Sequence, residues 1–126
     1  MYSPELLDHF QHPRNAGDLA NPDVSVQREN PACGDVLKLT LQIRDERIAE
    51  IGFRAKGCVP AMACASALTE LVKGKTIKEA HGLSRQELVS SIRVLPEAST
   101  HASHLAIETL TAALQEYERV SRLGKR

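Results

Sequence analysis

The stretch VLKLTLQIRDERIAEIGFRA, residues 36–55, contains two runs in which apolar and polar residues alternate. A period of two is typical of a β-strand with one buried and one exposed face. The polar residues Asp45 and Glu46 separate the runs and suit a turn. We therefore predict an antiparallel hairpin, whose inner face carries Leu37, Leu39, Leu41 and Ile43 from the first run and Ala49, Ile51, Phe53 and Ala55 from the second.

The segment before this hairpin carries the signals of one helix and one short strand. Ser3 is a typical helix-capping residue and Pro4 suits the first helical position, whereas Pro13 should end the helix. Further along, Val24 and Val26 alternate with polar neighbours. This alternation predicts a second, shorter strand region.

Helix signals follow the hairpin. The Ala-rich segment from Pro60 to Val72 predicts a helix that ends at Gly74. Two capping boxes, each with a hydroxyl residue three positions before a carboxylate, predict two short helices. These boxes are Thr76 with Glu79 and Ser84 with Glu87.

A last helix should follow a break at Leu95-Pro96 and start near Ser99 or Thr100. Its predicted inner face consists of Ala102, Leu105, Ala106, Leu110, Ala113, Leu114 and Tyr117. The order of elements predicts a single α+β domain over residues 1–126, in which a small antiparallel sheet has helices packed on one face.

Composition excludes several classes of function. The 126 residues include 16 basic and 16 acidic side chains, so the formal net charge is zero and neither nucleic acid nor an anionic membrane is an expected partner. Three cysteines without the spacing of a disulfide framework favour a reducing compartment. Since neither a signal peptide nor a membrane-length apolar run is visible, we expect a cytoplasmic protein.

Two cysteines and an aspartate are predicted to meet at the open end of the hairpin. Cys33 lies in a glycine-containing turn before the first strand, and Asp35 follows two residues later. Cys58 follows Gly57 after the second strand and precedes a helix, whose N-terminus is expected to favour the thiolate. The strand order therefore makes these groups neighbours.

His101, expected in the first turn of the last helix, could complete the site. Two sulfurs, one imidazole and one carboxylate suit a four-coordinate zinc ion, or part of an iron–sulfur cradle. The histidine and the aspartate each have a simpler interpretation. His101 could be an exposed residue at the start of the helix, and Asp35 could be a turn residue that hydrogen-bonds to its own backbone. His104 is either a surface residue or a substitute ligand, whereas Cys64, among alanines, should be a small core residue.

Several motifs along the chain resemble those of the NifU/IscU-type scaffold family of iron–sulfur cluster assembly. The resemblance runs from about Tyr2 to Tyr117. Its motifs are Tyr2-Ser3, Asp8-His9-Phe10, His12-Pro13-Arg14-Asn15-Ala16-Gly17, Pro31-Ala32-Cys33-Gly34-Asp35, Gly57-Cys58, Leu68-Thr69-Glu70 and Val72-Lys73-Gly74-Lys75-Thr76.

This resemblance implies a three-stranded antiparallel sheet with packed helices and a solvent-facing site. There a transient [2Fe–2S] cluster would be assembled and passed to apoproteins, with sulfur from a pyridoxal-phosphate-dependent cysteine desulfurase. The implied site residues are Cys33, Asp35, Cys58 and His101, and the chain itself would not be an enzyme. The isolated protein could hold Zn²⁺ at the same site.

The chain departs from the family around its last site segment. The family has L-P-P-V-K-x-H-C, whereas this chain reads Leu95-Pro96-Glu97-Ala98-Ser99-Thr100-His101-Ala102. Ala102 replaces the third cysteine and cannot bind a metal. The altered L-P-P-V-K element also argues against docking of the specialised Hsp70 chaperone.

Two alternatives to the scaffold hypothesis remain open at this point. One is a zinc-bound sulfur acceptor that takes persulfide from a desulfurase without building a cluster. The other is a degenerate paralogue that only binds proteins. The ligand types do not discriminate between zinc and an iron–sulfur cluster, because thiolates suit both.

Overall fold

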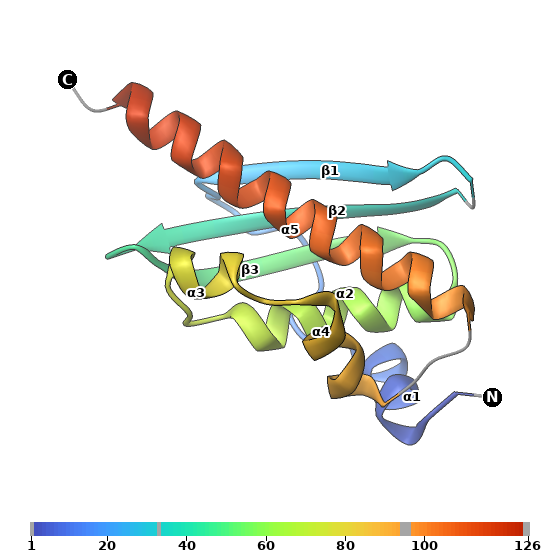
Figure 1. The fold of residues 1–126 in the computed structure, drawn as a ribbon. Helices are drawn as coiled ribbons and strands as arrows, with labels where there is room; N and C mark the ends of the chain where they lie inside the picture. Colours follow the sequence, from blue (N-terminus) through green and yellow to red (C-terminus); the bar gives the residue numbers. More distant parts are fainter. Residues whose placement is uncertain (1, 33, 94–96, 125–126) are drawn as a thin grey trace.

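The computed structural model describes residues 2–32, 34–93 and 97–124 as a three-stranded sheet with helices. Figure 1 shows the arrangement of these elements. In chain order they are α1 (Pro4–Gln11), β1 (Val24–Asn30), β2 (Asp35–Arg44), β3 (Arg47–Lys56), α2 (Val59–Val72), α3 (Ile77–His81), α4 (Arg85–Ile92) and α5 (Glu97–Gly124). The predicted α+β class and three-stranded antiparallel sheet are confirmed.

The sheet has the order β1-β2-β3, and both strand pairs are antiparallel. The β2–β3 turn is formed by Asp45 and Glu46, whose φ angles of 53° and 61° are of the kind that a two-residue hairpin turn requires. The register then shifts beside Gln42, which leaves Ala49 without a partner in β2. Ile48 is therefore fully buried and Ala49 only half-buried. The prediction that Ala49 lies on the inner face was wrong, because the bulge interrupts the strict alternation of buried and exposed residues.

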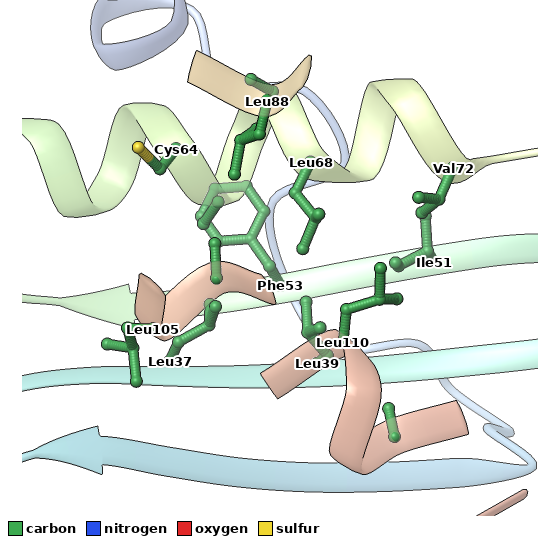
Figure 2. Close-up of a cluster of buried hydrophobic side chains, with 14 of the residues drawn as sticks. Leu37, Leu39, Ile51, Phe53, Cys64, Leu68, Val72, Leu88, Leu105 and Leu110 are labelled. Carbon is green, nitrogen blue, oxygen red and sulfur yellow. The ribbon is translucent and has the colours of Figure 1, made fainter. Parts of the chain in front are cut away.

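Helices α2 and α5 pack on the same face of the sheet and against each other (Figure 1). Their buried side chains meet the inner residues of β2 and β3 in one largely aliphatic core that also contains Phe53 (Figure 2). Leu39 and Leu41 are fully buried in it. Full burial of a leucine side chain stabilises the folded state by about 1.5–3 kcal/mol relative to an exposed side chain. The predicted inner face of the last helix is buried as expected, except that Tyr117 is half-buried.

The other face of the sheet is crossed by the segment between α1 and β1. The Gly17 backbone N–H donates to the Phe53 carbonyl at 2.7 Å, and the Leu19 N–H donates to the Thr40 hydroxyl at 3.1 Å. Gly52 must be glycine here, because a Cβ at this position would lie 2.3 Å from the Gly17 carbonyl oxygen. This crossing buries Thr40 on what would otherwise be the exposed face.

The predicted helix starts are confirmed for three helices. The Ser3 hydroxyl accepts the Leu6 N–H at the start of α1. Both capping boxes are formed, with Thr76 paired to Glu79 and Ser84 paired to Glu87.

Helix α5 begins at Glu97, before the predicted Ser99 or Thr100. Glu97 and Ala98 belong to residue types with high intrinsic helix propensity, so the helix begins before the predicted capping residues. The predicted break at Leu95-Pro96 lies outside the described residues. Although α5 has 28 residues, no helix of the described chain is both long and apolar enough to cross a membrane.

A polar network joins α1 to α2. His9 is buried, with its Nδ1 atom 2.8 Å from the Ser66 hydroxyl and its Nε2 atom 3.5 Å from a Glu70 carboxylate oxygen. Ser66 also accepts the Arg14 backbone N–H at 2.8 Å. Because the carboxylate requires an N–H at Nε2, Nδ1 of the neutral ring accepts the Ser66 proton. The network therefore holds the segment after α1 against α2.

Burial, reinforced by the charge of Arg14, lowers the pKa of His9 below its ordinary value of about 6.5. As the pH falls through the ordinary pKa of histidine, His9 takes up a proton in the unfolded chain but not in the folded chain. We therefore expect the free energy of unfolding, measured with urea, to fall between about pH 7.5 and about pH 5.5. His9→Gln should reduce this difference, whereas the exposed control His12→Gln should keep it. Equal pH dependence in both variants would contradict the role assigned to His9.

Candidate functional site

Asp35 is the first residue of β2, at the end of the sheet where the β1–β2 and β2–β3 pairs both terminate. It has the same parity along the strand as Leu37, so its side chain belongs to the helix-covered face of the sheet. Asp35 is only 4% exposed. A carboxylate this deeply buried requires hydrogen-bond partners.

Cys58 supplies those partners from the start of α2. Cys58 is the N-cap residue of α2, and only Gly57 separates it from the end of β3. The Cys58 backbone N–H donates to one Asp35 carboxylate oxygen at 3.2 Å, and its thiol faces the other at 3.5 Å. The predicted meeting of Asp35 and Cys58 is confirmed.

Gly57 makes this approach possible. Its φ of +149° is one that side-chain-bearing residues rarely adopt, and a Cβ at this position would lie 2.1 Å from an Asp35 carboxylate oxygen. In the sequence Gly57 indicated the end of a strand and formed part of the Gly57-Cys58 motif, but nothing there pointed to Asp35 as its neighbour. Its contact with Asp35 depends on the register between strands far apart in the chain.

The Cys58 thiol is held in its protonated form. Partial burial is the largest cause that raises its pKa, and the charge and hydrogen bond of Asp35 raise it further. The Ala61 backbone N–H, in the first turn of α2, acts in the opposite direction but does not prevail. The helix N-terminus therefore favours the thiolate as expected, but burial and Asp35 outweigh its effect on the pKa of Cys58.

The Asp35–Cys58 pair can exchange its proton for a metal. A cation near both groups would favour the thiolate. It would also stabilise the Asp35 carboxylate, which in this structure is stabilised by hydrogen bonds from Cys58. One sulfur and one oxygen ligand would then bind from two different strand ends. Such binding should strengthen as the pH rises, because the proton competes with the metal.

Cys64 is fully buried on α2, among the core side chains (Figure 2). Burial raises the pKa of its thiol to about 12. Its predicted role as a small core residue is confirmed, and a thiol with this pKa is a poor ligand and nucleophile near neutral pH.

His101 is exposed on α5 and lines a groove beside Asn30 and Pro31. Because α5 begins at Glu97, His101 is the fifth residue of the helix and not in its first turn as predicted. Ala102, at the position of the family's third cysteine, is 2% exposed and faces the core.

The remaining predicted ligand, Cys33, lies outside the described residues. Over residues 2–32, 34–93 and 97–124, no group of three or more His, Cys, Asp or Glu side chains is arranged to hold a metal ion. The structure thus brings Asp35 and Cys58 together and places His101 beside the end of the neighbouring strand β1.

Comparison with known proteins identifies similar sequences. The model of the NifU-like N-terminal domain family matches residues 1–122. The iron–sulfur cluster assembly scaffold protein IscU 1 of Archaeoglobus fulgidus is 40% identical over 119 residues, covering 94% of this chain and 78% of that protein. IscU of Escherichia coli is 38% identical over 121 residues, covering 93% of this chain and 94% of that protein.

Solved structures with little sequence identity share the fold. The N-terminal part of a NifU-like protein from Brucella abortus has a TM-score of 0.75 at 19% identity, and the match covers 92% of this chain and 93% of that one. A SUF-system protein from Fervidobacterium islandicum has a TM-score of 0.77 at 21% identity, with 90% and 96% covered.

Asp35→Asn tests the control of Cys58 by its neighbour. Removing the negative charge should lower the pKa of Cys58 and increase its alkylation rate near pH 8 by roughly two- to tenfold. Residue-resolved mass spectrometry of iodoacetamide labelling measures this rate. Asp18→Asn, on the other face of the sheet, is the matched control and should leave it unchanged. A Cys58 rate that is unaltered in Asp35→Asn would contradict the proposed coupling.

Gly57→Ala tests the close approach. The added Cβ must displace the Asp35 carboxylate, and the unfavourable φ costs about 1–3 kcal/mol of folding free energy. Gly74→Ala is the control, because Gly74 also has a positive φ, of +85°, but nothing lies within 4 Å of its Cβ position. Urea unfolding should show destabilisation in both variants, whereas Cys58 alkylation should change only in Gly57→Ala. The same alkylation rate in both would count against the steric role of Gly57.

Proposed function

Because the chain belongs to the NifU-like N-terminal domain family, we propose that it is a scaffold for iron–sulfur cluster assembly. It binds a transient [2Fe–2S] cluster as cargo and passes it to apoproteins. The observation that carries this proposal is the contact between the Asp35 carboxylate and the Cys58 thiol at the exposed end of the sheet. The names of its relatives, which are IscU scaffold proteins, support it.

The proposed ligands are Cys33, Asp35, Cys58 and His101. Thiolates bind iron strongly, whereas a carboxylate is a weaker ligand for it, so Asp35 is suited to be the exchangeable ligand. The hydrogen bonds that Cys58 makes to Asp35 would orient this carboxylate before the cluster arrives. Zn²⁺ fits the same mixture of sulfur, nitrogen and oxygen donors and would occupy the site in the isolated protein.

The scaffold would lower no chemical barrier of its own and is thus proposed to be a non-enzymatic partner of other proteins. Its sulfur would come from a cysteine desulfurase, and its recipients would be apo forms of iron–sulfur proteins. We place this activity in the cytoplasm, where free thiols such as Cys58 stay reduced.

The alanine at position 102 favours a second candidate function. With one thiolate fewer than the family pattern that the sequence resembles, the site is better matched to a single zinc ion than to a cluster with four cysteine ligands. In this alternative the protein is a zinc-bound acceptor of sulfur from the desulfurase. It would increase desulfurase turnover without forming a coloured cluster.

Anaerobic reconstitution with iron, L-cysteine and a cysteine desulfurase tests the scaffold function. The wild-type protein should acquire visible absorption with about two iron and two sulfide ions per cluster, and should then activate an apo-ferredoxin. Cys58→Ser should lose most of the cluster, because it removes a thiolate ligand. The buried Cys64→Ala is the matched control and should retain it. Desulfurase stimulation without absorption in the wild-type protein would instead favour the zinc-bound acceptor.

A further inference from the structure

Three basic residues gather on the face of the sheet that is opposite to α2 and α5. Lys38 alternates with the buried leucines of β2, and Arg54 and Lys56 occupy the corresponding positions on β3. With Gln27 and Val36 they line a hollow of about 290 Å³, called here the basic hollow. Every described residue in its lining belongs to a strand, and none of them is acidic.

The basic hollow carries more positive charge than its surroundings neutralise. Lys38 and Arg54 share a single carboxylate, that of Asp18, at 3.4 and 3.5 Å. Lys56 is exposed and adds a third positive charge, in a chain whose formal net charge is zero. The Arg54 side chain is 70% exposed, so its guanidinium group can bind a further anion. An anionic partner is therefore the electrostatic complement of this surface.

The spacing of the cations matches an extended acidic polypeptide. Lys38 and Arg54 are register partners, and the Cα atoms of such partners are about 4.5–5.5 Å apart. Lys56 lies two residues beyond Arg54, or about 7 Å along β3. Alternate side chains of any extended segment repeat at this same distance, so carboxylates at positions i and i+2 match Arg54 and Lys56. A phosphate offers its charge at one point, whereas such a segment offers a carboxylate to each cation.

The basic hollow lies at the same end of the sheet as the Asp35–Cys58 pair. Val36, in its lining, directly follows Asp35 on β2, and Lys56 precedes Cys58 by two residues. Val36 and Lys56 are also register partners. A protein bound at the hollow is therefore adjacent to the proposed cargo site. Because Asp35 belongs to the helix-covered face, the bound protein does not have to displace it.

We propose that the basic hollow docks an acidic, extended segment of the apoprotein that receives the cargo. The inference rests on the proposed function and adds a recognition surface for its recipients. Exposed charges at an interface act mainly on the rate of association and on its salt dependence. Contacts of this kind suit a recipient, because the encounter must be fast and must end once the cargo has moved.

A labelled peptide with three glutamates at alternate positions tests the hollow without any cargo. Fluorescence anisotropy measures its binding to the intact protein, and the wild-type affinity should fall as salt is added. The double variant Arg54→Glu, Lys56→Glu should bind about tenfold or more weakly, because two attractions become repulsions. The matched control is Arg44→Glu, Arg47→Glu, which changes the net charge equally at the other end of the hairpin. It should keep the wild-type affinity.

Equal peptide affinity in the two double variants overturns the proposal. All four substituted residues are exposed, so thermal unfolding should show that both variants fold. The milder pair Arg54→Gln, Lys56→Gln should show a smaller loss of affinity in the same direction. Displacement of the peptide by inorganic phosphate beyond the effect of chloride at equal ionic strength would identify a small-anion site and also overturns the proposal.

Cluster transfer to an acidic apo-ferredoxin tests the assignment to the recipient. The second-order rate constant of the wild-type protein should fall with added salt, and Arg54→Glu, Lys56→Glu should be about fivefold or more slower at low salt. Unchanged transfer by this variant overturns the assignment but leaves the scaffold function intact. If the wild-type protein forms no cluster, the scaffold function fails, and the peptide still decides whether the hollow binds acidic segments.

Discussion

The pairing of β2 with its two neighbours is the constraint on which the rest of the structure depends. Alternating apolar side chains on β2 and β3 require a cover, which α2 and α5 provide on one face. Because β2 is central, its first residue lies between the ends of β1 and β3. The start of β2 is therefore where residues from the β1–β2 turn, the β3–α2 junction and α5 can meet.

At that junction a buried carboxylate accepts hydrogen bonds from the backbone N–H and the thiol of one cysteine. Burial of a carboxylate without partners is energetically costly, and Asp35 is almost fully buried. Cys58 compensates for this cost with two hydrogen bonds, one from its backbone N–H and one from its thiol. Partial burial raises the pKa of the Cys58 thiol most and the contact with Asp35 raises it further, so the thiol stays protonated until a cation competes for the site. A scaffold that must both bind and release its cargo benefits from such a balance, because neither the bound nor the free state leaves a buried charge without a partner.

Local patterns predicted most of the elements. Period-two alternation identified β2 and β3, and the capping residues Ser3, Thr76 and Ser84 marked helix starts, because these signals depend on neighbours within a few residues. Predictions were less accurate where tertiary packing overrides such signals. Because of the bulge at Ala49, Ile48 is buried in place of Ala49. Helix α5 begins earlier than the hydroxyl residues Ser99 and Thr100 suggested.

The sequence by itself determined the α+β class, the residues on the inner faces, the family and the proximity of Asp35 to Cys58, since antiparallel order alone brings those two chain positions together. Only the tertiary structure decided the protonation of Cys58, the requirement for glycine at position 57 and the opposite orientations of Ala102 and His101. The physical reason is that burial and close approach depend on atoms from elements distant in the chain. A single segment determines its own periodicity, but not which atoms will surround it.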